Sequence, residues 1–187
     1  MNLSIVSYMD ESATWHIREL QQTLSDLTGS KASLLSWEPH LTVGDGVTVD
    51  DDQFQKLVNE VKTSAVALPA FSLQLSGFSS IDNRPIGKNE VSTPYVLYID
   101  VIVSQQLLDV VSAVEKITRS GEKWYHMPSP YLPHVTLAFR DLTAEGYQKG
   151  LAYLDGRSVD ITTTIDHIAL VEKLPDIDVE RTRLSLS

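Results

Sequence analysis

The chain has 187 residues, of which 42% are apolar and 21% charged, and it contains no cysteine. These proportions are typical of a globular protein with a substantial core, and the lack of cysteine excludes disulfides, thiolate nucleophiles and zinc-thiolate sites. The formal net charge of −10 argues against an extended nucleic-acid surface, which needs a basic footprint, so any anion site must be a local pocket. We expect a single domain over residues 1–187, with halves at about 1–90 and 91–187.

The sequence also bears on where the protein resides. No stretch approaches the roughly 18 apolar residues of a membrane span, and residues 1–6 lack the basic region of a secretory signal. We therefore expect a cytoplasmic protein that makes no contact with a membrane, and we expect it to be a monomer.

The apolar pattern of the first half predicts the order strand, helix, strand, helix, strand. Apolar residues alternate in the expected strands and recur at helical spacing in the expected helices. The Gly-Asp-Gly sequence at 44–46 predicts a turn directly after the second strand. The predicted elements are a strand over 3–8, a helix over 17–27, a strand over 34–43, a helix over 54–61 and a strand over 71–75.

The second half repeats this order after a turn-rich connection over residues 80–94. Its predicted elements are a strand over 95–103, a helix over 107–117, a strand over 133–137, a helix over 143–154, a strand over 159–171 and a last strand over 181–186. The repetition predicts two copies of a β-α-β-α-β unit related by a pseudo-twofold axis. We expect an α+β fold in which two mainly antiparallel sheets form a central cleft, with the helices outside.

One short pattern, Pro-His-apolar-Thr-apolar, occurs at residues 39–43 and again at 133–137. Successive side chains of a strand point to opposite faces, so each histidine shares a face with the threonine two residues later. Imidazole has an unperturbed pKa near neutrality, and two of them are able to divide the work of proton donor and proton acceptor. The repeated pattern therefore predicts a two-histidine site.

The duplicated His-x-Thr-x tetrapeptides, at 40–43 and 134–137, resemble those of the two-histidine (2H) phosphoesterase superfamily. Within it the chain is most similar to the 2′-5′ RNA ligase proteins, also called RNA 2′,3′-cyclic phosphodiesterases. The sequence Tyr-Leu-Pro-His-Val-Thr-Leu-Ala at 131–138 is particularly close, because an aromatic or apolar residue and a proline often precede that histidine. The resemblance covers nearly the whole chain. It implies a metal-independent phosphodiesterase that acts on 2′,3′-cyclic phosphates of RNA ends or small nucleotides.

Hydrolysis of a cyclic phosphate needs a base for the attacking water and an acid for the leaving ribose oxygen. The resemblance assigns these roles to His40 and His134, and the strand period places Thr42 and Thr136 to donate hydrogen bonds to the phosphate. Which histidine is the base stays open. No group of residues has metal-ligand spacing, so we expect neither a metal nor another cofactor.

Other residues near the motifs are weaker candidates for binding the substrate. Trp37, Tyr125 and Tyr131 would offer a ring face to a nucleobase, although packing of a loop against a sheet is the alternative for each. Arg140 has the same parity as the second motif and would reach the phosphate, unless it forms an ion pair with Asp141. His126, in the segment before the second motif, would line the rim of the cleft.

Two other functions remain open. The same histidines would catalyse reversible 2′-5′ joining or cleavage of RNA, and a protein that keeps the pocket without turnover would bind a nucleotide or an RNA end. The acidic net charge favours a small nucleotide or an RNA terminus as partner over a long nucleic acid. The identity of the substrate does not follow from the sequence, because loops form the rim of such a site.

Overall fold

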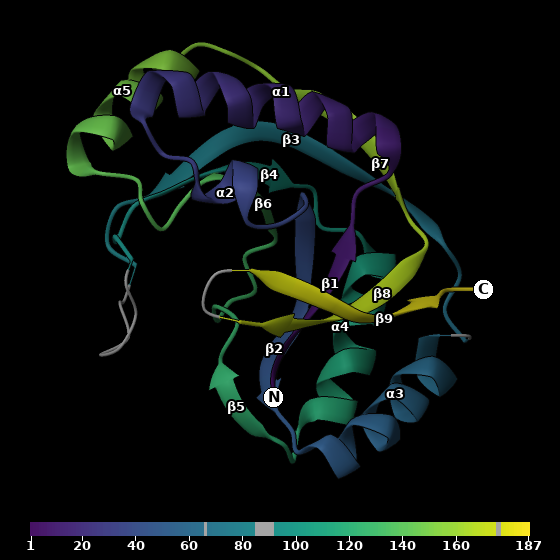
Figure 1. The fold of residues 1–187 in the computed structure, drawn as a ribbon. Helices are drawn as coiled ribbons and strands as arrows, with labels where there is room; N and C mark the ends of the chain where they lie inside the picture. The colour runs from purple at the N-terminus through teal and green to yellow at the C-terminus, as the bar shows by residue number, and fades with distance from the viewer. Residues whose placement is uncertain (66, 85–91, 175–176) are drawn as a thin grey trace.

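The computed structural model describes residues 1–65, 67–84, 92–174 and 177–187, and it contains two antiparallel sheets with helices packed against them (Figure 1). The first sheet has the strand order β5-β2-β1-β8-β9 and the second the order β6-β4-β3-β7. The α+β class and the two antiparallel sheets are thereby confirmed. The strands are β1 Asn2–Tyr8, β2 His40–Thr48, β3 Phe71–Ile81, β4 Val96–Val101, β5 Glu122–Tyr125, β6 His134–Ala138, β7 Asp160–Ile165, β8 His167–Lys173 and β9 Asp178–Ser185.

Each sheet has its own pair of helices. Figure 1 shows α1 and α5 above the second sheet, whereas α3 and α4 lie below the first. The helices are α1 Glu11–Thr28, α2 Ala32–Leu35, α3 Asp51–Ala65, α4 Gln105–Thr118 and α5 Ala144–Leu154. None of the helices in the described residues is long and apolar enough to cross a membrane.

The helices begin at capping residues that the sequence supplies. Asp10 precedes α1, and its carboxylate accepts a hydrogen bond of 2.9 Å from the Ala13 amide. Ser104 and Thr143 cap α4 and α5 in the same way. Such caps satisfy amides that have no partner within the helix. Helix α1 ends at Gly29, whose φ of 79° favours glycine.

The predicted repeat is present in the fold. In one unit β1 pairs with β2, and in the other β4 pairs with β6, antiparallel in both cases. The helix after each first strand crosses to the other sheet, because α1 packs on β6 and β7 whereas α4 packs on β2. The two units are therefore interlocked.

The predicted halves 1–90 and 91–187 do not each form one sheet. Strand β3 of the first half pairs with β4 and β7 in the second sheet, and β8 of the second half pairs with β1 in the first. The closing strand of each unit thus pairs with the opening strand of the other unit. Hydrogen bonding across the repeat, not position in the chain, determines which strands share a sheet.

Some local predictions were wrong. Residues 44–46 do not turn, since β2 continues to Thr48. A Cβ atom on Gly44 would overlap Val114 Cγ1, and one on Gly46 would lie 2.5 Å from the Trp124 ring, so both glycines permit close packing. Residues 34–35 belong to α2 instead of a strand, the segment 159–171 is divided between β7 and β8, and β5 was not predicted.

Candidate active site

The two motifs lie on β2 and β6, which contact each other although they belong to different sheets. The apolar residues of both motifs are at most 1% exposed, whereas the histidines and threonines are partly exposed on the opposite face. A charge on His134 is close enough to lower the pKa of His40. The strand alternation therefore brings the four predicted catalytic residues into one site: His40, Thr42, His134 and Thr136.

Both imidazoles are anchored in the same way. The Nδ1 atom of His40 lies 2.7 Å from the Glu38 carbonyl oxygen, and that of His134 lies 2.8 Å from the Leu132 carbonyl oxygen. A carbonyl oxygen only accepts hydrogen bonds, so Nδ1 carries the proton in each ring. In both motifs Nε2 is left to accept or donate a proton.

His167 shows what a structural histidine looks like in this fold. Its side chain is buried, the Tyr8 amide donates to its Nε2 over 3.2 Å, and its Nδ1 donates to Asp166 Oδ1 over 2.6 Å. Both ring nitrogens are occupied. His167 therefore has no nitrogen available for proton transfer, in contrast to the motif histidines.

The surroundings of His40 favour a neutral ring. Burial lowers the pKa of His40 to about 4, against the opposing effects of the hydrogen bond to the Glu38 carbonyl and the negative charge of Asp178. The positive charge of Lys173 acts in the same direction as burial. The residue paired with His40 on the neighbouring strand is Tyr8, whose ring lies edge-on at 6.4 Å. Burial raises the pKa of Tyr8 to about 12, so this neighbour stays uncharged. A neutral imidazole is the form that accepts a proton.

The surroundings of His134 differ in charge. Burial lowers its pKa as well, but the hydrogen bond to Leu132 and the negative charge of Asp100 act against that effect. Asp100 is the residue paired with His134 on β4, and its Oδ2 accepts a hydrogen bond of 2.5 Å from Ser79 Oγ. The ring of Tyr98 lies 4.9 Å from that of His134. A carboxylate thus takes the place that Tyr8 holds beside His40.

The motif threonines are held by their backbones and keep their hydroxyls available. The Tyr131 hydroxyl donates to the Thr42 carbonyl over 2.8 Å, and Gln21 Nε2 donates to the Thr136 carbonyl over 2.9 Å. Within the described ranges neither threonine hydroxyl forms a hydrogen bond. Two hydroxyl donors therefore accompany the two imidazoles, and Tyr131 supports the first motif through its hydroxyl.

The structure places Trp37 and Arg140 together. The Arg140 guanidinium carbon lies 4.9 Å from the centre of the Trp37 ring, and Lys173 Nζ lies 5.4 Å from the same centre. The predicted alternative, an ion pair between Arg140 and Asp141, was wrong. The Asp141 carboxylate instead accepts hydrogen bonds from the backbone amides of Lys31 and Ala32.

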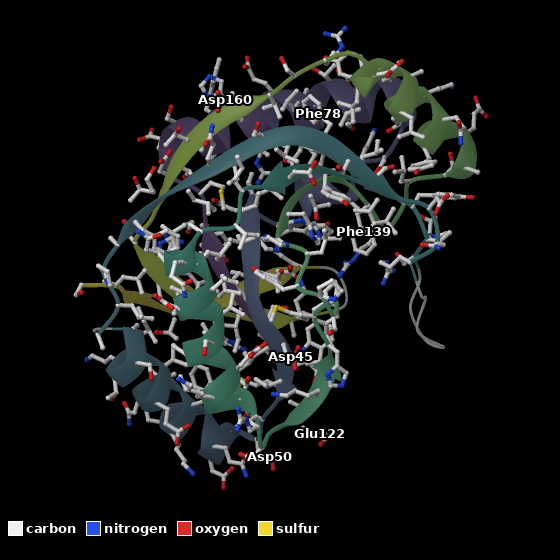
Figure 2. All side chains as sticks on the ribbon, turned by 180° about the vertical axis from the view of Figure 1, so that it is seen from behind. Asp45, Asp50, Phe78, Glu122, Phe139 and Asp160 are labelled. Carbon is white, nitrogen blue, oxygen red and sulfur yellow. The ribbon has the colours of Figure 1, made fainter. Side chains whose placement is uncertain are left out.

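Tyr125 ends β5, and His126 follows it. Tyr125 pairs with Gly46, six residues beyond His40 on β2. His126 Nδ1 lies 3.5 Å from Asp45 Oδ2, and its side chain is largely exposed. Figure 2 shows Asp45 below Phe139, the residue that follows β6. Tyr125 is close enough to Tyr131 to add to the effect of burial on its pKa, and the Tyr131 hydroxyl binds the Thr42 carbonyl. His126 instead lies beside Asp45.

Sequence reasoning missed Tyr8, Asp100 and Lys173. Tyr8 and Asp100 were predictable in principle, because each lies at or next to the end of the opening strand of a repeat and opposite a motif histidine. Nothing in the sequence near Lys173 indicates its proximity to His40, since 133 positions separate them in the chain. Its position depends on the pairing of β8 with β1.

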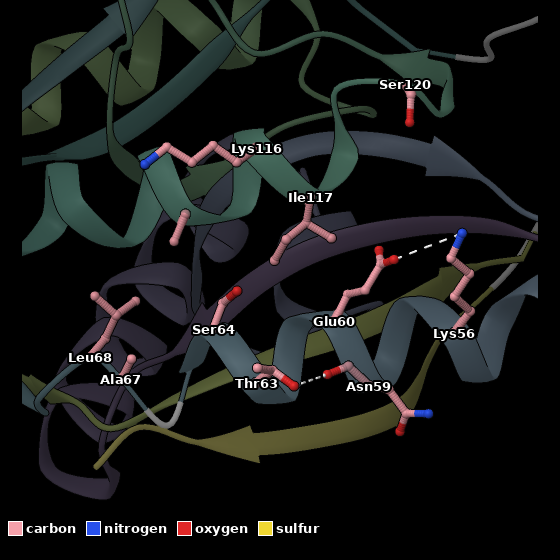
Figure 3. Close-up of a pocket in the computed structure, with 11 residues that line it drawn as sticks. Lys56, Asn59, Glu60, Thr63, Ser64, Ala67, Leu68, Lys116, Ile117 and Ser120 are labelled. Carbon is pink, nitrogen blue, oxygen red and sulfur yellow. Dashed lines mark hydrogen bonds and ion pairs between the residues drawn. The ribbon is translucent and has the colours of Figure 1, made fainter.

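The structure has a cavity elsewhere. A groove of about 1070 Å³ lies between α3 and α4, and Figure 3 shows that its lining includes Lys56, Glu60 and Ile117. It contains neither motif and no histidine. Across the described parts of the chain, no three histidine, aspartate or glutamate side chains gather as metal ligands would.

Known structures share this fold. TT0787 of Thermus thermophilus has a TM-score of 0.67 at 20% identity, with 100% of this chain and 98% of that chain covered. For E. coli LigT complexed with 3′-AMP the TM-score is 0.59 at 14% identity, with coverage of 100% and 98%. For Kluyveromyces marxianus Usb1 it is 0.57 at 13%, with coverage of 99% and 98%.

A comparison with curated proteins finds no match. The family model described as the 2′-5′ RNA ligase superfamily matches residues 8–176. The matched range includes both motifs and all but the ends of the chain, and it confirms the resemblance stated from the sequence. The chain therefore belongs to the 2′-5′ RNA ligase superfamily of two-histidine phosphoesterases.

Proposed function

We propose that this protein hydrolyses 2′,3′-cyclic phosphates of RNA ends or small nucleotides by metal-independent acid–base catalysis. One observation carries the proposal. Two histidines from strands of different sheets are both anchored through Nδ1 to a backbone carbonyl, which leaves both Nε2 atoms for proton transfer. Paired imidazoles with available hydroxyl donors beside them suit in-line displacement at phosphorus.

The surroundings of the two rings support a division of roles. Neutral His40 accepts a proton from water as the water oxygen bonds to phosphorus. The bond between phosphorus and one ribose oxygen breaks, and protonated His134 donates its Nε2 proton to that oxygen. Asp100 favours the charged form of His134, and the bound phosphate anion does the same. Thr42 and Thr136 donate to the non-bridging oxygens, on which negative charge accumulates.

The proposed substrate is a small nucleotide or an RNA terminus. The structures of E. coli LigT with 3′-AMP and with ATP, and of K. marxianus Usb1 with uridine monophosphate, support nucleotide binding by this fold. The net charge of −10 supports a short ligand, since an extended nucleic acid would be repelled outside a local site.

Joining of RNA through a 2′-5′ bond is the second candidate, and the description of the matching family favours it. It uses the same groups in the reverse direction, because an acid that protonates a leaving hydroxyl oxygen becomes a base when that hydroxyl attacks. Excess water drives hydrolysis, so joining needs a bound RNA end with a free hydroxyl.

Phosphorus NMR distinguishes these functions. The protein is incubated with a nucleoside 2′,3′-cyclic phosphate, with 2′-5′ and 3′-5′ dinucleotides, and with an RNA bearing a cyclic phosphate plus an acceptor RNA. We expect conversion of the cyclic phosphates to one monoester, whose chemical shift identifies the oxygen that leaves. Turnover of only the acceptor pair would establish joining, and binding of nucleotides with no turnover of any compound would contradict catalysis.

A further inference from the structure

Arg140 has an unusual backbone conformation. Its φ is 66°, and among the described residues it is the one non-glycine residue with positive φ. The conformation is held from both sides, because the Asp141 amide donates to the Phe139 carbonyl and the Thr93 amide donates to the Arg140 carbonyl, each over 2.9 Å. Residues other than glycine are strained in this region. The fold therefore maintains a strained arginine directly after the second motif strand.

The Asp141 side chain helps to hold this segment. Its carboxylate accepts hydrogen bonds from Ser30 Oγ over 2.6 Å and from the Lys31 amide over 2.8 Å. These bonds connect the end of β6 to the segment before α2. They leave the Arg140 guanidinium without a carboxylate partner within 4.0 Å in the described part of the chain.

The guanidinium lies beside the segment that leads into the first motif. It lies over Trp37, three residues before His40, and the Lys173 ammonium lies over the same ring. Lys173 lies near both His40 and Arg140. Its positive charge adds to the effect of burial in lowering the pKa of His40, and the charge of Arg140 adds to the effect of burial in lowering the pKa of Lys173. Two cations thus lie near the first motif of a protein whose net charge is −10. Lys173 also forms an ion pair with the Asp178 carboxylate, so the positive charge in excess at this place comes from Arg140.

Trp37 is also fixed in place. Arg18 Nη2 donates to the Trp37 carbonyl over 3.0 Å, and Arg18 Nη1 donates to the Leu34 carbonyl over 2.7 Å. The ring lies 6.4 Å from that of Phe139. Trp37 thus holds the Arg140 guanidinium in position, whereas Lys173 is held by its ion pair with Asp178. This role of Trp37 differs from the base-stacking role that the sequence suggested.

The chemistry of the pair indicates a phosphate ligand. A planar guanidinium presents donors that match two phosphate oxygens. The adjacent Lys173 ammonium has three N–H donors, of which one binds Asp178. The motif residues already surround the cyclic phosphate, which occupies the 2′ and 3′ oxygens of its ribose. The remaining ribose oxygen that carries phosphate in nucleotides and in RNA is the 5′ oxygen.

We propose that Arg140, held on Trp37 beside Lys173, binds the phosphate on the 5′ side of the ribose that carries the cyclic phosphate. This inference rests on the proposed function and defines its substrate class. The enzyme would prefer 5′-phosphorylated nucleotides, or RNA ends with an internucleotide phosphate at that position, over nucleosides that carry the cyclic phosphate alone.

The test compares three substrates: adenosine 2′,3′-cyclic phosphate, the same compound with a 5′-phosphate, and a dinucleotide ending in a 2′,3′-cyclic phosphate. Because one charge-assisted contact contributes about tenfold in binding, we expect kcat/KM to be about tenfold higher for the second and third, mainly through KM. Preference for the second alone identifies free nucleotides, and preference for the third alone identifies RNA ends.

The variant Arg140→Gly removes the guanidinium and also relieves the strained φ. We expect it to lose the tenfold preference while its Tm is equal to or higher than that of the wild type. Arg157→Gln is the matched control, because Arg157 lies over Tyr153 at 4.2 Å on α5 and is remote from the motifs. It should retain the full preference. A lower Tm with an intact preference in Arg140→Gly would show that the arginine is structural.

Calorimetric binding separates this inference from the proposed function. Adenosine 2′-phosphate and adenosine 2′,5′-bisphosphate are titrated into the wild type and Arg140→Gly. Tighter binding of the bisphosphate to the wild type alone supports the inference even if no cyclic phosphate is hydrolysed. Equal affinities of the wild type for the two compounds, or hydrolysis of all three substrates at equal kcat/KM, overturn the inference and leave the proposed function intact.

Discussion

The two motif strands have the same sequence pattern and the same local geometry, but they differ in what faces them from the next strand. His40 and His134 both donate from Nδ1 to the carbonyl two residues earlier. Opposite His40 lies Tyr8, which stays neutral, whereas opposite His134 lies Asp100. The repeat thus supplies two equivalent imidazoles, and the neighbouring strands place a neutral side chain beside one and a carboxylate beside the other.

This difference matters because acid–base catalysis needs its two groups in opposite protonation states. A site with true twofold symmetry would give both imidazoles the same affinity for a proton. Here burial and Lys173 lower the pKa of His40, partly offset by Asp178, whereas at His134 the charge of Asp100 acts against the effect of burial. The comparison supports the proposed roles, with the base on β2 and the acid on β6.

The largest expected effect comes from removing either imidazole. His40→Ala and His134→Ala should each lower kcat on a cyclic phosphate by about 10²- to 10⁴-fold, the usual contribution of a positioned acid or base. Quenched time-course assays with a nucleoside 2′,3′-cyclic phosphate, whose leaving group is the ribose oxygen, measure the loss of kcat in both variants. Either variant retaining more than a tenth of the wild-type rate would contradict the two-histidine mechanism.

A substrate with a better leaving group separates the two roles in the same variants. A nucleoside 3′-(para-nitrophenyl phosphate) releases a stable phenolate that needs no proton. It should restore much of the rate of His134→Ala and little of the rate of His40→Ala. The opposite pattern would reverse the assignment while preserving the mechanism.

The next effect concerns stability. The pKa of His40 is about 4 in the folded chain and 6.5 when unfolded, so its stabilising contribution is complete above pH 6.5 and is lost as the pH falls through 4. The free energy of unfolding should fall by up to about 3 kcal/mol on this account, and partial solvent exposure of the ring reduces the amount. Urea unfolding of the wild type and His40→Gln at several pH values measures it. Parallel pH dependences in the two proteins would refute the lowered pKa.

We expect the two motif threonines to contribute equally to kcat, whereas the two histidines have different roles. Thr42→Val and Thr136→Val preserve shape and remove one hydroxyl donor each, so each should lower kcat by about tenfold through weaker stabilisation of the phosphate oxygens. Steady-state kinetics at the pH optimum tests this. A loss confined to KM would indicate that the hydroxyl contacts the ground state equally well.

The sequence predicted those parts of the site that depend on local periodicity. Alternation along a strand was enough to place His40 beside Thr42 and to bury Leu41 behind them. The repeated order of elements indicated two related units, because each helix and strand has its own apolar pattern. Both inferences need only the pattern within about ten neighbouring residues.

Features that depend on distant pairing were not accessible. The exchange of β3 and β8 between the sheets is decided by hydrogen bonds across the whole chain. In the sequence Gly46 is typical of a turn, whereas in the structure the Trp124 ring packs so closely against it that a Cβ atom would not fit. The conformation of Arg140 likewise depends on the Thr93 amide, which belongs to another part of the chain.

The smallest expected effect is the most direct test of the comparison between the two motifs. Asp100→Asn removes the negative charge that favours a protonated His134 and keeps a polar group opposite Ser79 Oγ. The pKa of His134 should then be lower, so the alkaline limb of the kcat profile should move to lower pH while the acidic limb, set by His40, stays in place.

Tyr8→Phe is the matched change on the other strand, because it removes a hydroxyl without changing the charge near His40. It should leave both limbs of the profile in place. If Asp100→Asn instead lowers kcat equally at all pH values, the carboxylate acts only by holding β3 against β4 through Ser79. A shift of the acidic limb in Asp100→Asn would mean that the carboxylate acts on the base, and the assignment of roles to the two strands would then be reversed.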